Sequence, residues 1–362
     1  MIRRIIKYTS AGIGVVIFIL VLTVIYQYKE IQYASIFSTV DAKVQLGLSK
    51  LGVFITDRKV KKEGIFPPKK VAEIKIKIPL DRNLDKFEEK IKEEFKPPGV
   101  NIIKFNRINL KDTYQIEVEI GAKKILTHRL LFFLKKARVA ILIDDFGYIN
   151  DDNLVTSFFK DLKFPFTISI IPGTPFAKKI AEEAHSSGKQ ILVHLPMQPE
   201  GKFINRYKWI VLNGMSEDKI KETVKEAIKD IPYAEGLNNH MGSLVTSREG
   251  LIKPVLEVLK EKGMFFVDSR TSSSSVAYSL AEKIGLRSTF NCVFLDNKKE
   301  KNYIENHFNK LISIALQRGW ALGLGHANLI TASTLMSLVN TCDRRKLEFV
   351  TVSQILDLGR IK

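Results

Sequence analysis

Residues 139–147 read VAILIDDFG, in which five apolar residues are followed by two aspartates, Asp144 and Asp145. A short continuous apolar run is typical of a strand that is buried on both faces of a parallel sheet. Two carboxylates directly after such a strand are costly to place unless a cation or hydrogen-bond donors meet them. The stretch therefore predicts a buried strand over 139–143 with polar chemistry at its carboxyl end.

Short apolar runs of this kind recur toward the C-terminus. Further strands are expected at 166–171, 191–194, 236–239, 264–267, 287–295 and 321–324. Helices are expected between them at 151–162, 177–187, 216–231 and 250–262. Short apolar strands that alternate with helices predict an α/β domain with a largely parallel sheet. Seven such units from residue 137 onward suit a closed or nearly closed barrel.

Polar residues collect at the carboxyl ends of the expected strands. These residues are Asp144, Asp145, His194, Asn238, Asn239, His240, Asp268, Arg270 and His326. Three of the six histidines of the chain are among them. The carboxyl ends of parallel strands meet at one edge of a barrel, where active sites form in such folds. We therefore expect a single functional site at this edge.

One carboxylate and two imidazoles suit a zinc-type site, in which three protein ligands leave one position open. Zinc makes a bound water acidic, and a nearby carboxylate can accept its proton. One of Asp144 and Asp145 can thus bind the ion while the other acts as base. Two other interpretations remain open: the aspartates cap the helix at 151–162, or His194 is a satisfied core histidine. His240 lies in LNNHMGS, a polar turn in which a core histidine is unexpected.

His326, in LGLGHAN, faces the same edge. An imidazole opposite the ion can protonate a leaving amine, and a fourth metal ligand or a core histidine are the alternatives. Asp268 and Arg270, in VDSRT, can pair and tune the base electrostatically, or form a structural salt bridge. Ser243 lacks a GxSxG elbow, and the sequence has no GxGxxG or P-loop. A serine hydrolase and a nucleotide-dependent enzyme are therefore disfavoured.

Five motifs at these positions resemble the divergent polysaccharide deacetylases, bacterial envelope proteins distantly related to NodB-type carbohydrate esterases. The motifs are LIDDFG at 142–147, HLPMQP at 194–199, NNHMGS at 238–243, DSRT at 268–271 and GHA at 325–327. The resemblance covers about residues 137–357. It implies a distorted seven-stranded (β/α) barrel of the NodB-like type.

The resemblance also implies roles for individual residues. Asp144 matches the general base of the esterases, and Asp145 matches a metal ligand. His194 matches the first histidine of their metal motif, and His326 matches the late histidine that acts as acid.

This sequence departs from the esterases at two motifs. They place a second histidine four residues after the first, where this sequence has Gln198. Their arginine-proline-rich motif is replaced by NNHMGS. We infer that His240 supplies the missing ligand. Supporting positions are assigned to Asp268, Arg270, Gln198 and Asn239.

The function implied is that of a metal-dependent hydrolase, with zinc as the expected divalent metal. Its substrate would be an N-acetylated cell-envelope polysaccharide that loses acetyl groups. The alternative is a catalytically silent envelope glycan-binding or scaffold protein on a deacetylase-like barrel. Gln198 and the additional module before residue 137 favour this alternative.

The N-terminus predicts a membrane anchor. Residues 11–26 carry no charge, and residues 9–28 provide roughly the 20 residues that a bilayer requires. Arg3, Arg4 and Lys7 precede this segment, so residues 1–8 are expected in the cytoplasm and the rest beyond the inner membrane. A cleaved signal peptide is the competing interpretation, but no small-x-small site follows closely.

The segment before the barrel divides into two parts. Residues 29–70 are expected as a linker, since Pro67 and Pro68 stand there among lysines. A βαββ module is expected over 71–136 on the basis of apolar periodicity. Its elements are strands at 71–78, 103–110 and 114–120 and a helix at 84–95. The module is either a spacer or a substrate- or partner-binding part.

The net charge of +18 suits an anionic partner or a Lys/Glu-rich surface. No zinc-finger spacing or aromatic RNA-binding signature accompanies the charge, so no nucleic-acid partner is expected. The expected contacts are an envelope polysaccharide and, through the N-terminal helix, the lipid bilayer. Cys292 and Cys342 form no CxxC pair. Cys292 is expected as a small core residue, and a disulfide between the two cysteines remains open.

Overall fold

The structure, a computed structural model, describes residues 2–96, 98–148, 151–356 and 358. The expected cytoplasmic tail begins at Met1 and the expected barrel domain ends at Lys362, and both of these ends lie outside the described residues. The chain divides into two compact units, Met1–Lys136 and Ala137–Lys362. The second unit begins at the residue where the sequence places the start of the barrel domain.

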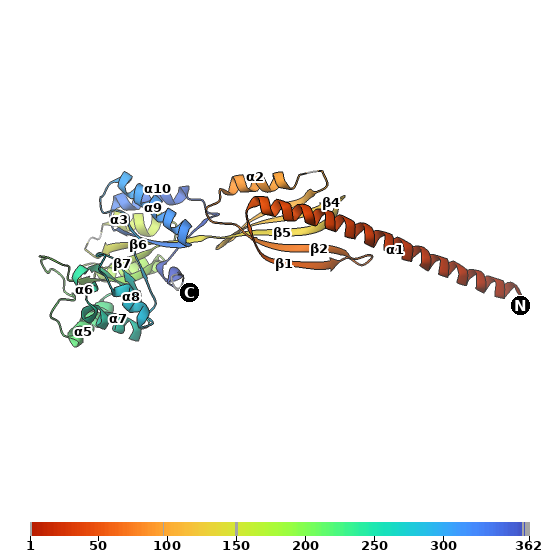
Figure 1. The fold of residues 1–362 in the computed structure, drawn as a ribbon. Helices are drawn as coiled ribbons and strands as arrows, with labels where there is room; N and C mark the ends of the chain where they lie inside the picture. Colours follow the sequence, from red (N-terminus) through yellow and green to blue (C-terminus); the bar gives the residue numbers. More distant parts are fainter. Residues whose placement is uncertain (1, 97, 149–150, 357, 359–362) are drawn as a thin grey trace. The chain divides into compact units, whose positions relative to one another are not determined.

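Within its described residues, the first unit contains two helices and a five-stranded sheet. Its elements are α1 (Ile2–Leu51), β1 (Phe54–Glu63), β2 (Lys69–Lys77), α2 (Leu84–Glu94), β3 (Asn101–Asn109), β4 (Thr113–Ala122) and β5 (Ile125–Lys135). The strand order is β1-β2-β5-β4-β3, and only the pairing of β2 with β5 is parallel. Alternate residues of β2, β4 and β5 form one core with α2 and the last turns of α1, so both helices cover the same face of the sheet (Figure 1).

Helix α1 is longer than the anchor that the sequence predicts. The helix continues to Leu51, through more than half of the segment expected as a linker. The reason is a second apolar stripe with helical spacing: Val40, Val44, Leu48 and Leu51 are all at least 97% buried in the core. The expected linker is thus replaced by helix, by β1 and by the start of β2.

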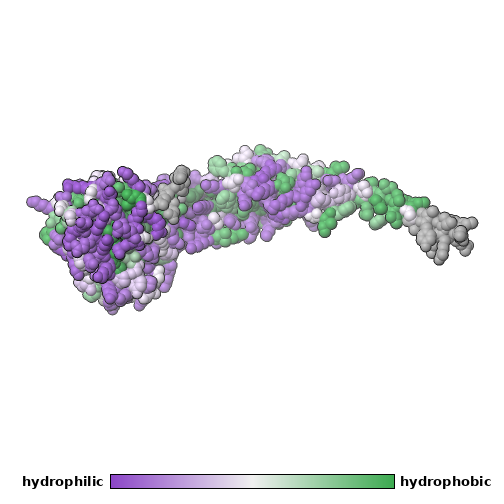
Figure 2. All heavy atoms as spheres, turned by 90° about the horizontal axis from the view of Figure 1, so that it is seen from below, coloured by the Kyte–Doolittle hydropathy of each residue, from purple (hydrophilic) through white to green (hydrophobic). Residues whose placement is uncertain are grey.

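The stretch of α1 over residues 12–25 is apolar and exposed, as the green stretch in Figure 2 shows. Helix α1 is the one helix among the described residues that is long and apolar enough to cross a membrane. A signal sequence near the N-terminus would have the same properties. The length and composition of this segment therefore agree with the predicted anchor, and its orientation remains a prediction.

The small module has more strands than the predicted βαββ unit. The three expected strands and the helix are present as β2, α2, β3 and β4. Strand β1 was missed because charged and exposed residues dominate it, as is common in edge strands. Strand β5 was missed because its LLFFL run has no visible alternation, although its residues alternate between buried and half-buried.

The second unit is an α/β domain in which helices connect parallel strands. Its strands are β6 (Ala137–Phe146), β7 (Thr167–Ile170), β8 (Gln190–Met197), β9 (Ala234–Met241), β10 (Phe265–Asp268), β11 (Ser288–Phe290), β12 (Val293–Phe294), β13 (Trp320–His326) and β14 (Leu347–Val350). Its helices are α3 (Asp152–Thr156), the π-helix η1 (Ser157–Asp161), α4 (Ala177–Ser186), α5 (Glu217–Asp230), α6 (Ser243–Thr246), α7 (Glu249–Glu261), α8 (Ala277–Lys283), α9 (Lys301–Arg318), α10 (Leu329–Thr341) and the 3₁₀ helix η2 (Val352–Ile355).

The sheet of this unit is parallel and curled. Its order is β11-β10-β9-β8-β7-β6-β13-β12, and β14 pairs with the first residues of β6. Strands β11 and β12 stand at opposite ends of this order, yet only Asn291 and Cys292 separate them in the chain. One bent segment thus follows β10 with its first half and β13 with its second half. The parallel α/β fold is confirmed.

The number of strands differs from the predicted seven. The described residues contain nine strands in this sheet. The sequence predicts one strand at 287–295, which is split where it changes partner, and it does not predict β14 at all. Cys292 is only partly buried, and Cys292 and Cys342 are both free, so the disulfide that the sequence left open is not formed.

Candidate metal centre

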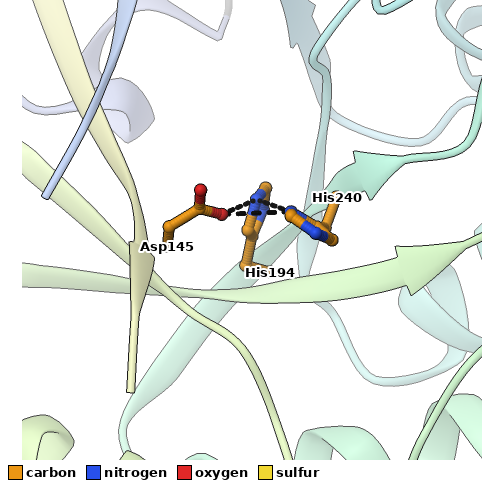
Figure 3. Close-up of side chains that lie close together, drawn as sticks. All are labelled: Asp145, His194 and His240. Atoms are coloured by element: carbon orange, nitrogen blue, oxygen red, sulfur yellow. Dashed lines mark hydrogen bonds and ion pairs between the residues drawn. The ribbon is translucent and has the colours of Figure 1, made fainter. Parts of the chain in front are cut away.

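Three side chains converge at the carboxyl ends of β6, β8 and β9. They are Asp145, His194 and His240, here called the triad, and Figure 3 shows them pointing toward one another. Oδ1 of Asp145 lies 3.1 Å from Nε2 of His194 and 3.0 Å from Nδ1 of His240. The two ring nitrogens are 3.0 Å apart. The three atoms thus form a nearly equilateral triangle.

This triangle fits a small divalent cation. Ligands at roughly 2.0–2.1 Å from a tetrahedral ion lie about 3.3 Å from one another, so a slight widening of the triangle makes it one face of the tetrahedron. Oδ1 of Asp145 is buried, and no hydrogen bond to it is found among the described residues. A buried carboxylate oxygen without a hydrogen bond is costly in a folded protein. The triad is therefore a candidate divalent-metal site.

The backbone at the end of β6 lets adjacent aspartates serve the same site. Asp145 has a φ of 67°, in the left-handed region that costs a non-glycine residue about 1–3 kcal/mol. The register between β6 and β7 also shifts between Ile143 and Phe146. As a result, Asp144 is buried while the Asp145 side chain is 38% exposed. Burial favours the neutral acid, but His194 and His240 hold the pKa of Asp145 well below its usual range.

Asn238 fixes the orientation of His194. Its Nδ2 donates to both carboxylate oxygens of Asp144, at 3.1 and 3.0 Å, and to Oγ of Ser269 at 3.1 Å. Its Oδ1 accepts from Ser169 and lies 3.0 Å from Nδ1 of His194. An amide oxygen can only accept, so Nδ1 of His194 carries the hydrogen. The lone pair of Nε2 then points into the triad, as metal binding requires.

Asp144 is the buried neighbour of the triad. Its Oδ2 lies 3.6 Å from Nε2 of His194. Burial, opposed mainly by the charge of His194, raises the pKa of Asp144 to about 6. Asp151, whose side chain accepts from the backbone of Asn153, caps the following helix. The interpretation of Asp144 and Asp145 as helix caps is therefore wrong.

His326 ends β13 opposite Asp144, with which it is in register across the pair of strands. Its Nδ1 lies 2.7 Å from Oδ1 of Asp296, a buried carboxylate that the sequence analysis missed. Oδ2 of Asp296 accepts from the backbone of His326 and from Thr331. Burial lowers the pKa of His326, but Asp296 outweighs it and, with Asp144 and Asp145, raises the value to about 9. Asp296 directly follows the strand predicted at 287–295, which was the available signal.

Tyr207 is a second residue that the sequence analysis missed. Its hydroxyl oxygen lies 2.8 Å from Nε2 of His240. It comes from a segment without regular secondary structure between β8 and α5, so periodicity gave no signal. This contact leaves Nδ1 of His240 facing the triad.

The sequence assigned supporting positions to four residues, and the structure gives them hydrogen bonds outside the triad. They are Asp268, Arg270, Gln198 and Asn239. Asp268 accepts hydrogen bonds from the backbone of Arg270 and from Ser275, and no ion pair joins Asp268 to Arg270 in the described chain. Oε1 of Gln198 accepts from the backbone of Asn213 and stays out of the triad. Asn239 bonds the backbone of Ser269 and Met241. Neighbouring strand residues face opposite sides, so Asn238 reaches the site in place of Asn239.

A comparison with protein-family models decides the family. The model described as divergent polysaccharide deacetylase matches residues 141–356, which is more than half of the chain. The chain belongs to the divergent polysaccharide deacetylase family. The resemblance predicted from the motifs is thereby confirmed. The match contains the triad, Asp144 and His326.

Relatives of this family member include two bacterial proteins. The uncharacterized protein YibQ of Escherichia coli K12 is 33% identical over 203 residues, which are 56% of this chain and 62% of YibQ. An uncharacterized protein of Haemophilus influenzae is 34% identical over 207 residues, 57% of this chain and 72% of that protein. The chain therefore spans less than two thirds of the length of YibQ.

A solved structure shares the fold. The crystal structure of an uncharacterized protein from Agrobacterium tumefaciens C58 superposes with a TM-score of 0.57 at 22% identity. The superposition covers 61% of this chain and 89% of that one. At this identity the likeness concerns the fold of the deacetylase domain alone.

Proposed function

We propose that this divergent polysaccharide deacetylase is a metal-dependent hydrolase that removes acetyl groups from an N-acetylated cell-envelope polysaccharide. The observation that carries the proposal is the convergence of three ligand atoms within 4.8 Å of one another, beside a second, buried carboxylate. Family membership supports the reaction class. Asp145, His194 and His240 would hold the ion, with zinc as the favoured metal because of the two imidazoles.

A divalent cation at the triad would supply Lewis-acid chemistry, by polarising the carbonyl oxygen and making water more acidic. The remaining steps belong to side chains. Asp144 would accept the proton of the water that attacks the amide carbon. A pKa of about 6 leaves this carboxyl mostly ionised at neutral pH and still basic enough to act.

His326 would donate a proton to the sugar nitrogen when the bond between carbon and nitrogen breaks. The products would be acetate and a free amine. With a pKa of about 9, the imidazole is protonated at neutral pH. Asp296 would hold Nδ1 of His326, which leaves Nε2 for the proton transfer. The acid and the base would therefore be ready in the same pH range.

The N-terminal helix supports a location at the membrane. We propose that the apolar part of α1 anchors the chain in the inner membrane, with residues 1–8 in the cytoplasm. Arg3, Arg4 and Lys7 carry the charge bias for this orientation. The deacetylase domain would then lie outside the cytoplasm, where an envelope polysaccharide is available.

Acetate release by the full chain in non-ionic detergent tests the proposal. Chelator-treated protein should release no acetate from chitin oligosaccharides or peptidoglycan fragments, and zinc should restore release. His240→Ala should lose metal about as strongly as His194→Ala, whereas Gln198→Ala, the matched control, should retain it. Full metal occupancy in His240→Ala would refute the ligand assignment. Glycan binding without acetate release under any divalent metal would establish the silent glycan-binding alternative.

A further inference from the structure

A polar cavity lies beside the loop that follows β10. Its volume is about 440 Å³. Its lining consists of Arg270, Ser272, Ser273, Ser275, Asn291, Cys292 and Phe294. Among the described residues, this lining contains one full positive charge and no carboxylate.

Arg270 stacks on an aromatic ring and has no anionic partner among the residues that the structure describes. Its guanidinium carbon lies 3.8 Å from the centre of the Phe290 ring, and no ion pair or side-chain hydrogen bond is found for it in the described part of the chain. Arg318 stacks over the same ring at 5.5 Å, and its Nη1 lies 3.9 Å from Sγ of Cys292 in the cavity wall. Two guanidinium groups therefore lie against one ring, and no ion pair with a carboxylate is found for either of them among the described residues.

The carboxylate nearest in sequence is already engaged. Asp268 is buried and accepts hydrogen bonds from Ser275 at 2.7 Å and from the backbone N–H groups of Arg270 at 2.8 Å and Tyr278 at 3.4 Å. These bonds hold the loop in shape, including the φ of 49° at Arg270. The carboxylate of Asp268 therefore binds groups of its own loop and does not pair with the guanidinium of Arg270 in the described chain.

The cavity adjoins the polar network of the metal centre. Ser269, directly before Arg270, accepts a hydrogen bond at 3.1 Å from Asn238, the residue that contacts Asp144 and His194. The carbonyl of Ser269 also accepts from Asn291 of the cavity lining, at 3.4 Å. Ser269 therefore joins the cavity wall to the residue that holds Asp144 and His194, which places the cavity at the same end of the sheet as the triad.

The geometry points to an anion-binding subsite in which Arg270 binds a carboxylate carried by the glycan. A guanidinium fork matches the two oxygens of a carboxylate or phosphate, and stacking on Phe290 fixes its plane. Hydroxyl groups of the serines can donate further hydrogen bonds. The inference that the anion belongs to the glycan rests on the proposed function, whereas binding of an anion does not.

Binding to the metal-free full chain in detergent tests the subsite without any turnover. The probes are N-acetylmuramic acid, which carries a carboxylate, N-acetylglucosamine, which does not, and inorganic phosphate. Isothermal titration should show the carboxylated sugar binding at least about tenfold more tightly than the neutral sugar. Arg270→Gln should remove this difference. Arg287→Gln, the same change at an arginine that directly precedes β11 and is not part of the cavity lining, should keep it.

Arg270→Lys guards against a folding defect, and the unfolding temperature of each variant is compared with that of the parent. The lysine variant keeps the charge but loses the fork, so its preference for the carboxylated sugar should fall between those of the parent and Arg270→Gln. Equal binding of the two sugars by the parent would overturn the glycan assignment, even if phosphate bound through Arg270. Unchanged preference in Arg270→Gln would overturn the subsite. Absence of acetate release would leave these binding results intact.

Discussion

The hydroxyl oxygen of Tyr207 lies 2.8 Å from Nε2 of His240, while Nδ1 of the same ring lies 3.0 Å from Oδ1 of Asp145. The two ring nitrogens of His240 thus have different tasks. If Nδ1 keeps its lone pair for a cation, Nε2 carries the hydrogen and donates it to Tyr207. Tyr207 would then set the tautomer of a metal ligand from a loop that is far from it in sequence.

Tyr207→Phe removes this partner while keeping the ring. We expect the affinity for zinc to fall by about 10–100-fold, the usual effect of losing a hydrogen bond to a metal-bound histidine. Competition with a chromogenic chelator measures the affinity. Tyr233→Phe is a matched control, since Tyr233 stacks on His185 rather than on a triad residue. Equal affinities for Tyr207→Phe and the parent would show that Tyr207 does not orient His240.

Substitutions of Asp144 and Asp145 should have different effects on metal content and on turnover. Asp145→Asn should release the metal because the amide is a poorer ligand and Oδ1 is shared by both imidazoles. Asp144→Asn should keep the metal and lose about 10²–10⁴-fold in turnover, because only proton transfer is lost. Metal content and acetate release are measured on both variants. Similar metal loss in both would mean that the two carboxylates bind the ion jointly.

The pH dependence of turnover should be bell-shaped. His326 acts as an acid, so turnover should fall as the pH rises through about 9, where the imidazole loses its proton. Asp144 acts as a base, so turnover should fall as the pH drops through about 6 or below, because a bound cation further favours its charged form. Initial rates between pH 4 and 10 measure both limbs.

Asp296→Asn tests the cause of the upper limb. Removing the carboxylate beside His326 should lower the pKa of the imidazole, so the upper limb should move to lower pH while the lower limb stays in place. A purely structural role of Asp296 would reduce the rate at all pH values without moving either limb. Thermal unfolding of the variant checks that the fold is retained.

The proposed orientation of the chain can be tested with reporters fused after Lys362. A reporter that is active only after export should be active, and a reporter that is active only in the cytoplasm should be silent. Replacing Arg3, Arg4 and Lys7 with glutamate should reduce export, because the positive charge before the apolar segment determines the orientation. Activity of the cytoplasmic reporter in the parent chain would contradict the proposal.

The parallel α/β fold and the gathering of one aspartate with His194 and His240 could be predicted from local patterns, whereas the choice of Asp145 over Asp144 came from the family resemblance. Apolar runs mark buried strands, and parallel strands bring their carboxyl ends together. The partners of these residues could not be found in this way. Asn238 and Asn239 differ only in which side of β9 they face, and a one-residue uncertainty in a strand reverses that assignment.

Contacts between distant segments were equally hidden. Asp296 precedes His326 by 30 residues, and their contact depends on the bend that splits β11 from β12. Tyr207 belongs to an irregular segment whose course no periodicity describes. In the first unit, the stripe from Val40 to Leu51 was readable as helix, but the prolines further on favoured the interpretation of the whole segment as linker.

The apolar segment and the last turns that pack into the core of the first unit belong to one continuous helix, α1. Each inserted residue would advance the following part by about 1.5 Å and rotate it by about 100°. Inserting seven residues near Lys29 would turn the stripe of Val40 and Val44 through almost two full turns, back to nearly its original direction. Inserting two residues would turn the stripe to roughly the opposite side of the helix axis relative to the apolar segment. The helix between the two parts therefore sets how far the five-stranded sheet lies from the apolar segment and how it is rotated relative to that segment.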